Sequence, residues 1–166
     1  MISVHAQVDI AASPERVWRV LMNFARYRNW HPYVEMEGVA ILGGEMGFSF
    51  RNKSDAPRGW KTEVTVTQME PSSNFAFKFG IAGLFTIEQW YSLEEIPDGT
   101  RVTHGSNYGG FLPTISARFI RKRLLSVHQV AIERLARGFV KSNKPQPQRA
   151  AKTPPKPRKG FRGYRR

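Results

Sequence analysis

Apolar and polar side chains alternate along the first ten residues of the chain. The even positions from Ile2 to Ile10 are apolar and the odd positions, which include His5, are polar. A period of two is typical of a strand with one buried face. We therefore expect a strand here, with His5 on its exposed side.

The pattern changes to a helical period at Ser13. Ser13 can accept a hydrogen bond from a free N–H of the first helical turn, and Pro14 suits the first helical position. Aromatic residues and a proline crowd the turn that follows this short helix, namely Tyr27, Trp30, Pro32 and Tyr33. So much aromatic surface favours a lid or a pocket wall. Closure of one end of the core would explain each ring equally well.

Further runs with strand character follow, separated by turn signals such as Gly43-Gly44 and Pro97-Asp98-Gly99. They cover residues 34–42, 46–53, 60–69, 73–79, 84–95 and 100–108. Their short connections favour an antiparallel meander. One face is large and mostly apolar, in Phe75, Phe77 and Phe79 and again from Phe85 to Leu93, as in a curved sheet with a concave surface.

A long helix is expected from Pro113 to about Lys141. Its apolar positions recur at helical spacing, through Ile120, Leu124, Val127, Ala131 and Leu135. Basic residues such as Arg134 and Arg137 then lie on the solvent-exposed sides of the helix. Such a helix would be roughly 40 Å long, enough to cross the sheet. A curved sheet around a long helix often leaves a gap, and we expect a ligand to bind there.

The chain has 166 residues, which favours one globular domain with a modest tail. It has no cysteine, which excludes disulfides, thiolate catalysis and thiolate metal sites. Neither a signal sequence nor an apolar run of membrane-spanning length is present in the sequence, so we expect a soluble, cytoplasmic protein.

The net charge of +13 is unevenly distributed. Residues 1–110 carry 10 lysines and arginines against 12 acidic residues, whereas residues 111–141 carry 7 against 1 and residues 142–166 carry 9 against none. We therefore expect a nearly neutral body with a basic helix and a basic tail.

The tail, residues 142–166, is rich in proline, lysine and arginine and is expected to be disordered. Phe161 and Tyr164 lie among arginines and glycines, as in segments that stack on unpaired bases of RNA. The same charge could hold the protein at an anionic membrane. A solubilising tail without a fixed partner is an equally good interpretation.

Several motifs, in this order, carry a resemblance to a known family. They are Ser13-Pro14-Glu15-Arg16-Val17-Trp18, Phe24-Ala25-Arg26-Tyr27, Trp30-His31-Pro32-Tyr33, Gly99-Thr100-Arg101-Val102-Thr103-His104 and Gly110 before the long helix. Over residues 1 to about 140 the chain resembles the polyketide cyclase/dehydrase-like branch of the SRPBCC superfamily, the START-related helix-grip proteins. One departure is His31, because relatives often carry asparagine before the proline.

The resemblance implies an α+β helix-grip fold. A curved antiparallel sheet of about seven strands would wrap around a long C-terminal helix, with two short helices after the first strand. The domain would span residues 1–141, followed by the tail, and a deep apolar cavity would bind lipids, polyketides or other hydrophobic molecules.

The candidate ligand-binding residues combine the aromatic turn with the inner face of the last strands and one side of the long helix. They are Trp30, His31, Tyr33, Phe77, Gln89, Tyr91, His104, Ser106, Tyr108, Leu124 and His128. Of these, Trp30, His31 and Tyr33 are candidate gate residues. The histidines are far apart in sequence and no phosphate-binding loop is present, so we expect neither a metal nor a cofactor.

Two functions are consistent with these residues. The first is a binding module or carrier for a hydrophobic small molecule or lipid, with the polar residues setting the orientation of the ligand. The alternative is a small cyclase or dehydratase acting on a polyketide-like substrate. In that case His104 or His128 would be the general base, and Tyr91 or Tyr108 would donate to a developing enolate.

Overall fold

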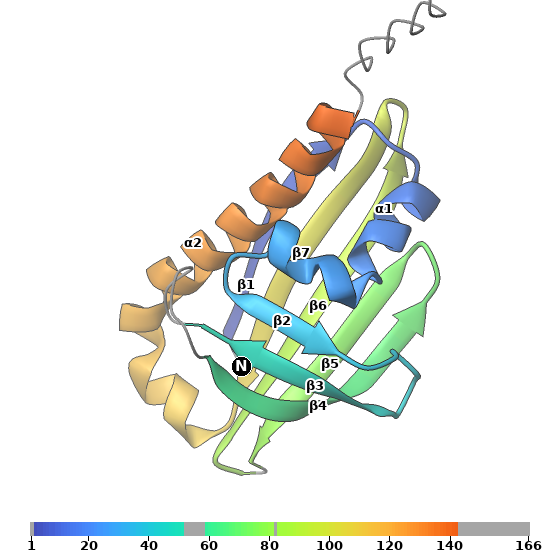
Figure 1. Ribbon diagram of the computed structural model, residues 1–166. Coiled ribbons are helices and arrows are strands. Elements are labelled where there is room, and N and C mark those ends of the chain that lie inside the picture. The colour runs from blue at the N-terminus through green and yellow to red at the C-terminus, as the bar shows by residue number, and fades with distance from the viewer. Residues whose placement is uncertain (1, 52–58, 82, 143–166) are drawn as a thin grey trace, which may run out of the picture.

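The computed structural model describes residues 2–51, 59–81 and 83–142, with the backbone alone for residues 111–120 and 141–142. The strands are β1 (Ile2–Ile10), β2 (Val34–Glu37), β3 (Glu45–Phe50), β4 (Trp60–Glu70), β5 (Asn74–Ile81), β6 (Phe85–Ile96) and β7 (Gly99–Gly109). The helices are α1 (Pro14–Leu21), the 3-10 helix η1 (Phe24–Asn29) and α2 (Phe111–Ser142) (Figure 1).

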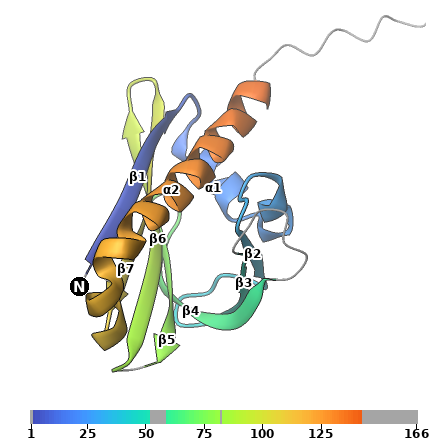
Figure 2. The same ribbon diagram turned by 90° about the vertical axis from the view of Figure 1, so that its left-hand side faces the viewer.

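All these strands form one antiparallel sheet in the order β1-β7-β6-β5-β4-β3-β2. The sheet is strongly curved, and α2 crosses it diagonally (Figure 2). α2 packs mainly on β1 and β7, whereas η1 packs on β2. The α+β helix-grip architecture is thereby confirmed.

β1 has the orientation that its alternating sequence predicts. It pairs with β7 along its whole length, with Ile2 opposite Tyr108. Val4 and Ala6 are buried and His5 is exposed. The buried face of β1 is one of the surfaces on which α2 packs.

α1 begins at Pro14 as expected, but its cap differs from the expectation. The backbone carbonyl of Ser13 accepts hydrogen bonds from the N–H groups of Arg16 and Val17, while its side chain makes no capping hydrogen bond. The hydroxyl instead bonds to the carboxylate of Glu15, which lowers the pKa of Glu15. The expectation that the Ser13 side chain caps the helix is therefore wrong.

β2 is shorter than the run 34–42 that the sequence indicates. Gly38 and Gly43 have φ angles of +106° and +76°, which favour glycine and turn the chain away from the sheet. Ile41 and Leu42, between these glycines, are exposed. The sequence predicted too long a strand because the apolar pattern continues into residues that form a loop.

Aromatic side chains fill the concave face of the sheet. Phe48, Phe75, Phe77 and Tyr91 are all fully buried. The ring centroids of Phe48 and Phe77 are 5.6 Å apart, and those of Phe75 and Phe77 are 5.5 Å apart. The large apolar face expected on β5 is present, although Phe79 at its end is only half-buried.

α2 extends slightly beyond the predicted helix at both ends. Ala131 and Leu135 are buried, while Leu124 and Val127 are half-buried. Ile120 falls where side chains are not described. The basic side chains described on this helix, Arg121, Lys122, Arg123, Arg134 and Arg137, are exposed, as expected.

Within the described ranges, no helix is both long enough and apolar enough to cross a membrane. The expectation of a disordered tail concerns residues 142–166, and all of these except Ser142 lie outside the described part of the chain.

Candidate functional site

Three histidines from distant parts of the sequence meet inside the fold. His31 follows η1, His104 lies on β7 and His128 lies on α2, and none of them is more than 3% exposed. The ring centroids of His104 and His128 are 4.4 Å apart, and those of His31 and His104 are 6.3 Å apart. We call His31, Tyr91, His104, Ser106 and His128 the histidine cluster.

His31 holds the turn that leads into β2. Its Nδ1 atom accepts hydrogen bonds from the backbone N–H groups of Val34 at 3.0 Å and Tyr33 at 3.3 Å. In the neutral ring the proton is then on Nε2. The Nε2 atom is buried and has no hydrogen-bond partner in the described part of the chain.

His104 is fixed by β6. It lies opposite Tyr91 in the sheet, and the two rings stack with centroids 4.0 Å apart and an interplanar angle of 4°. Its Nδ1 atom is 3.0 Å from the carbonyl oxygen of Trp90. Because a carbonyl only accepts, Nδ1 carries the proton and donates, which leaves Nε2 with its lone pair.

His128 approaches from α2 and reaches β7. Its Nε2 atom is 3.0 Å from the hydroxyl oxygen of Ser106. Its Nδ1 atom is buried and, among the described residues, has no partner. The serine and the histidine therefore form a hydrogen-bonded pair that links the helix to the sheet.

Burial keeps the histidine cluster uncharged. It lowers the pKa of His31 to about 3 and that of His128 to about 4, and it holds the pKa of His104 well below its usual value. Burial also raises the pKa of Tyr91 above its usual value. At neutral pH the cluster therefore consists of neutral hydrogen-bonding groups.

The other predicted site residues are more dispersed. Gln89 is buried on β6 opposite Ser106, and Phe77 belongs to the aromatic core. Tyr108 and Leu124 are half-buried, on β7 and α2 respectively. Tyr33 is also half-buried.

The ring of Tyr33 stacks on Phe50 at the β2–β3 end of the sheet, with the ring centroids 6.4 Å apart. The structure therefore brings together five of the predicted residues, the members of the histidine cluster, and Trp30 lies beside them. Roles for these residues in ligand binding, or for Trp30, His31 and Tyr33 as a gate, stay predictions.

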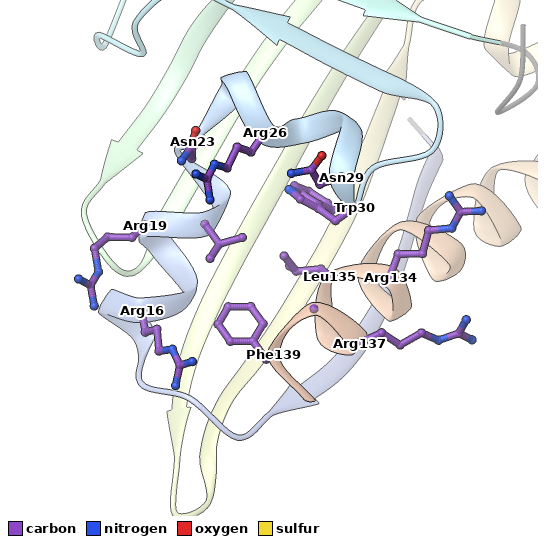
Figure 3. A pocket seen from close by; sticks show the side chains of 12 residues that line it. Arg16, Arg19, Asn23, Arg26, Asn29, Trp30, Arg134, Leu135, Arg137 and Phe139 are labelled. Carbon is purple, nitrogen blue, oxygen red and sulfur yellow. The ribbon is translucent and has the colours of Figure 1, made fainter. Parts of the chain in front are cut away.

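A separate pocket opens between α1, η1 and the C-terminal half of α2 (Figure 3). Its volume is about 880 Å³. Trp30, Leu135 and Phe139 lie between the helical segments and supply much of its apolar surface. The full lining is Arg16, Arg19, Val20, Asn23, Arg26, Asn29, Trp30, Arg134, Leu135, Arg137, Gly138 and Phe139.

Trp30 connects this pocket to the histidine cluster. It lines the pocket, and its ring centroid is 5.2 Å from that of His31. It also packs on Tyr27, with the centroids 4.6 Å apart. The Trp30 indole is 5% exposed, and its Nε1–H has no partner within the described ranges.

Sequence reasoning found Trp30 but missed the rest of the pocket. Arg16 and Arg19 repeat at helical spacing on α1, as do Arg134 and Arg137 on α2. Each pair alone is typical of a solvated helix face. A further signal was Gly138 inside a helix, where a Cβ would meet nothing within 4 Å.

Within the ranges that the structure describes, no group of three or more His, Cys, Asp or Glu side chains is arranged to hold a metal ion.

The fold and the pocket define a helix-grip protein with space for a small molecule. The chain belongs to the family described as polyketide cyclase / dehydrase and lipid transport, whose sequence model matches residues 1–139. No curated protein matches the chain in sequence.

Solved structures share this fold at low sequence identity. Protein MLL2253 from Mesorhizobium loti has a TM-score of 0.67 at 18% identity, with 86% of this chain and 99% of that chain covered. TTHA0849 from Thermus thermophilus has a TM-score of 0.65 at 16% identity, with 86% and 100% covered.

DynU16, described as a putative protein in the dynemicin biosynthetic locus, has a TM-score of 0.62 at 16% identity, with 86% of this chain and 48% of that chain covered. At such identities these likenesses show the fold alone.

Proposed function

We propose that the protein binds a hydrophobic small molecule or lipid and serves as its carrier. The observation that carries this proposal is the pocket of about 880 Å³ with Trp30, Leu135 and Phe139 in its lining. The volume of this pocket falls within the range of roughly 300–1,000 Å³ that is typical of small-molecule pockets. The family description, which includes lipid transport, also supports it.

The buried polar atoms beyond the pocket support a second part of the proposal. Trp30 Nε1, His31 Nε2 and His128 Nδ1 are buried without a partner among the described residues. A buried polar group without a partner costs free energy, which a polar group of a ligand or a water molecule would offset. We place the inner end of the ligand toward Trp30 and the histidine cluster.

The pocket can be tested by filling it. Gly138 lines the pocket, and a side chain there has open space. Gly138→Leu should remain folded but retain less apolar ligand, while the matched variant Gly138→Ala should retain nearly the wild-type amount. The ligand would be extracted from natively purified protein and identified by mass spectrometry. Equal retention by all three proteins would place the ligand elsewhere.

Catalysis is the second candidate function, and the Ser106–His128 hydrogen bond is the observation in its favour. General-base catalysis works best when the pKa of the base is near the working pH. The pKa of about 4 for His128 therefore favours binding over proton abstraction at neutral pH.

The catalytic alternative requires a loss of turnover that is separate from ligand loss. His128→Gln keeps a polar group beside Ser106, and His104→Phe keeps a ring against Tyr91. Loss of turnover of the extracted ligand in either variant, with ligand retention and melting temperature unchanged, would support a reaction. Unchanged ligand chemistry in wild type and both variants would support binding alone.

Contact of residues 142–166 with RNA or an anionic membrane is a separate proposal that their charge alone supports. Truncation after Lys141 tests it. Equal binding of RNA and anionic vesicles by the full-length and shortened proteins, over a range of salt concentrations, would exclude a role for the tail.

A further inference from the structure

The charged residues that line the pocket are all arginines. Arg16 and Arg19 come from α1, Arg26 comes from η1, and Arg134 and Arg137 come from α2. No aspartate or glutamate is among the lining residues. Three elements therefore bring five positive charges to one opening.

The described acidic residues neutralise this charge only in part. Arg137 forms a long ion pair of 3.7 Å with Glu133, one helical turn away. Arg16 lies over the ring of Phe139, 5.6 Å from its centroid. Arg26 and Arg134 form no ion pair with any acidic residue of the described ranges.

The arginine side chains of the pocket point in different directions. In Figure 3, Arg16 points toward Phe139, whereas the end of the Arg26 side chain lies beside Asn23, on the α1 side of η1. Arg134 and Arg137 extend outward from α2 at the rim. The positive charge of Arg134 also reaches inward, because it helps to lower the pKa of His31.

The buried indole of Trp30 provides an independent indication of a ligand group. Its Nε1–H donor is unpartnered among the described residues, although the ring is 5% exposed and lines the pocket. An indole N–H can only donate. A solvated basic surface would explain the arginines but not a buried donor that has no partner among the described residues and lies beside the apolar side chains of the pocket.

We infer that the pocket selects an amphiphile whose head group is an oxyanion, either a carboxylate or a phosphate. The inference rests on the proposed function, because it assumes that this pocket holds the ligand. The apolar chain packs against Trp30, Leu135 and Phe139, and the head group accepts hydrogen bonds from the arginines. Guanidinium groups suit this task because their planar fork matches both kinds of oxyanion.

Ligands of equal chain length separate the contribution of the head group to the binding affinity from that of the apolar chain. Binding of dodecanoate, dodecyl phosphate and dodecanol would be measured by calorimetry at low and high salt, with inorganic phosphate as the head group alone. We expect at least one anionic ligand to bind roughly tenfold more tightly than dodecanol, as for one strong charge-assisted hydrogen bond. That difference should shrink at high salt. Which of the two anions binds more tightly identifies the head group.

The outcomes distinguish the two proposals. If dodecanol binds as tightly as both anions, the inference fails and the proposed function stands. If none of the chain-bearing ligands binds, both fail. If inorganic phosphate binds as tightly as dodecyl phosphate, the inference of an amphiphilic ligand is overturned, because the apolar chain then contributes nothing to the affinity.

Two arginines can be removed without touching the apolar lining. Arg26→Gln combined with Arg134→Gln should lower affinity for the preferred anion about tenfold and leave dodecanol binding unchanged. Arg121→Gln combined with Lys122→Gln is the matched control, since both residues are exposed on the same helix roughly 20 Å from Arg134 and the same number of charges is removed. An equal loss of affinity in the control variant would mean that the effect comes from the overall charge of the protein, and it would overturn the inference.

Discussion

The imidazole of His31 holds the backbone of Val34, with Nδ1 accepting the Val34 N–H at 3.0 Å. An asparagine side chain places its Oδ1 atom at the same number of bonds from Cα and makes similar bonds to the backbone two and three residues ahead. Histidine at position 31 can therefore make the backbone contact expected of an asparagine before the proline.

His31→Asn should therefore be tolerated better than His31→Leu. Leucine fills more of the volume but leaves the buried N–H of Val34 without an acceptor, which costs about 1–3 kcal/mol. We expect the asparagine variant to have the larger free energy of unfolding, by about 1–2 kcal/mol in urea titrations. A more stable leucine variant would mean that ring volume, and not the hydrogen bond, is the contribution of His31.

The stability of the protein should fall as the pH is lowered from 6.5 to 5. The unfolded chain takes up protons on its histidines near pH 6.5, whereas burial lowers the pKa of His31 to about 3 and that of His128 to about 4 in the folded state. The folded state thus binds fewer protons in this window, and each buried histidine contributes up to about 1.4 kcal/mol per pH unit. At pH values above the histidine pKa of the unfolded chain, the whole of this contribution to the stability of the folded state is present.

Urea unfolding at pH 7, 6 and 5 measures this slope. His31→Asn should reduce it by about one third, because one of three buried histidines no longer titrates. His5→Gln is the control, because His5 is exposed on the other face of the sheet and its charge is only the second cause, after burial, of the lowered pKa of His128. The same reduction in both variants would contradict the assignment to the histidine cluster.

Ser106 and His128 should be energetically coupled. Ser106→Ala leaves Nε2 of His128 buried without its partner, at a cost of about 1–3 kcal/mol. In the His128→Leu background the same serine substitution should cost less, because no imidazole remains to be left unpaired. A double-mutant cycle on free energies of unfolding should give a coupling of about 1 kcal/mol. A coupling near zero would show that the contact contributes nothing to stability.

Gly138→Ala should stabilise the protein by about 0.5–1 kcal/mol, because alanine is the better helix former and its Cβ meets no atom within 4 Å. Gly99→Ala should have the opposite effect and cost more than about 2 kcal/mol. Gly99 has a φ of +142°, and a Cβ there would collide with the Ile10 carbonyl. Thermal unfolding checks both, and destabilisation by Gly138→Ala would indicate that this position is packed rather than open.

Most of the fold was predictable because the sheet has one buried face. Alternation in β1 and helical spacing in α2 identified both elements and the sides that they bury. The same alternation placed His104 and Ser106 on one face of β7. The end of β2 was not predictable in this way, since Ile41 and Leu42 are apolar but exposed.

The candidate site was less accessible to sequence reasoning. The position of His31 depends on the turn after η1, which no periodicity describes. The arginines of the pocket come from three segments, and Arg16 on α1 and Arg134 on α2 are more than a hundred residues apart. Each segment alone predicts only a solvent-exposed face, and the pocket exists only where α1, η1 and α2 come together.

The pairing of β1 with β7 also affects how the protein folds. Gln7 reaches the side chain of Thr103 across 96 positions of the chain, and Thr100 reaches the carbonyl of Ala12 across 88. Contacts between residues so distant in sequence form slowly, because a long loop must close before they can contribute. During synthesis, β1 therefore cannot pair with β7 until most of the domain has emerged from the ribosome. Both edges of β1 are unpaired during that time, whereas one of them pairs with β7 in the folded sheet, so this is the stage at which the chain is most exposed to pairing with another copy of itself.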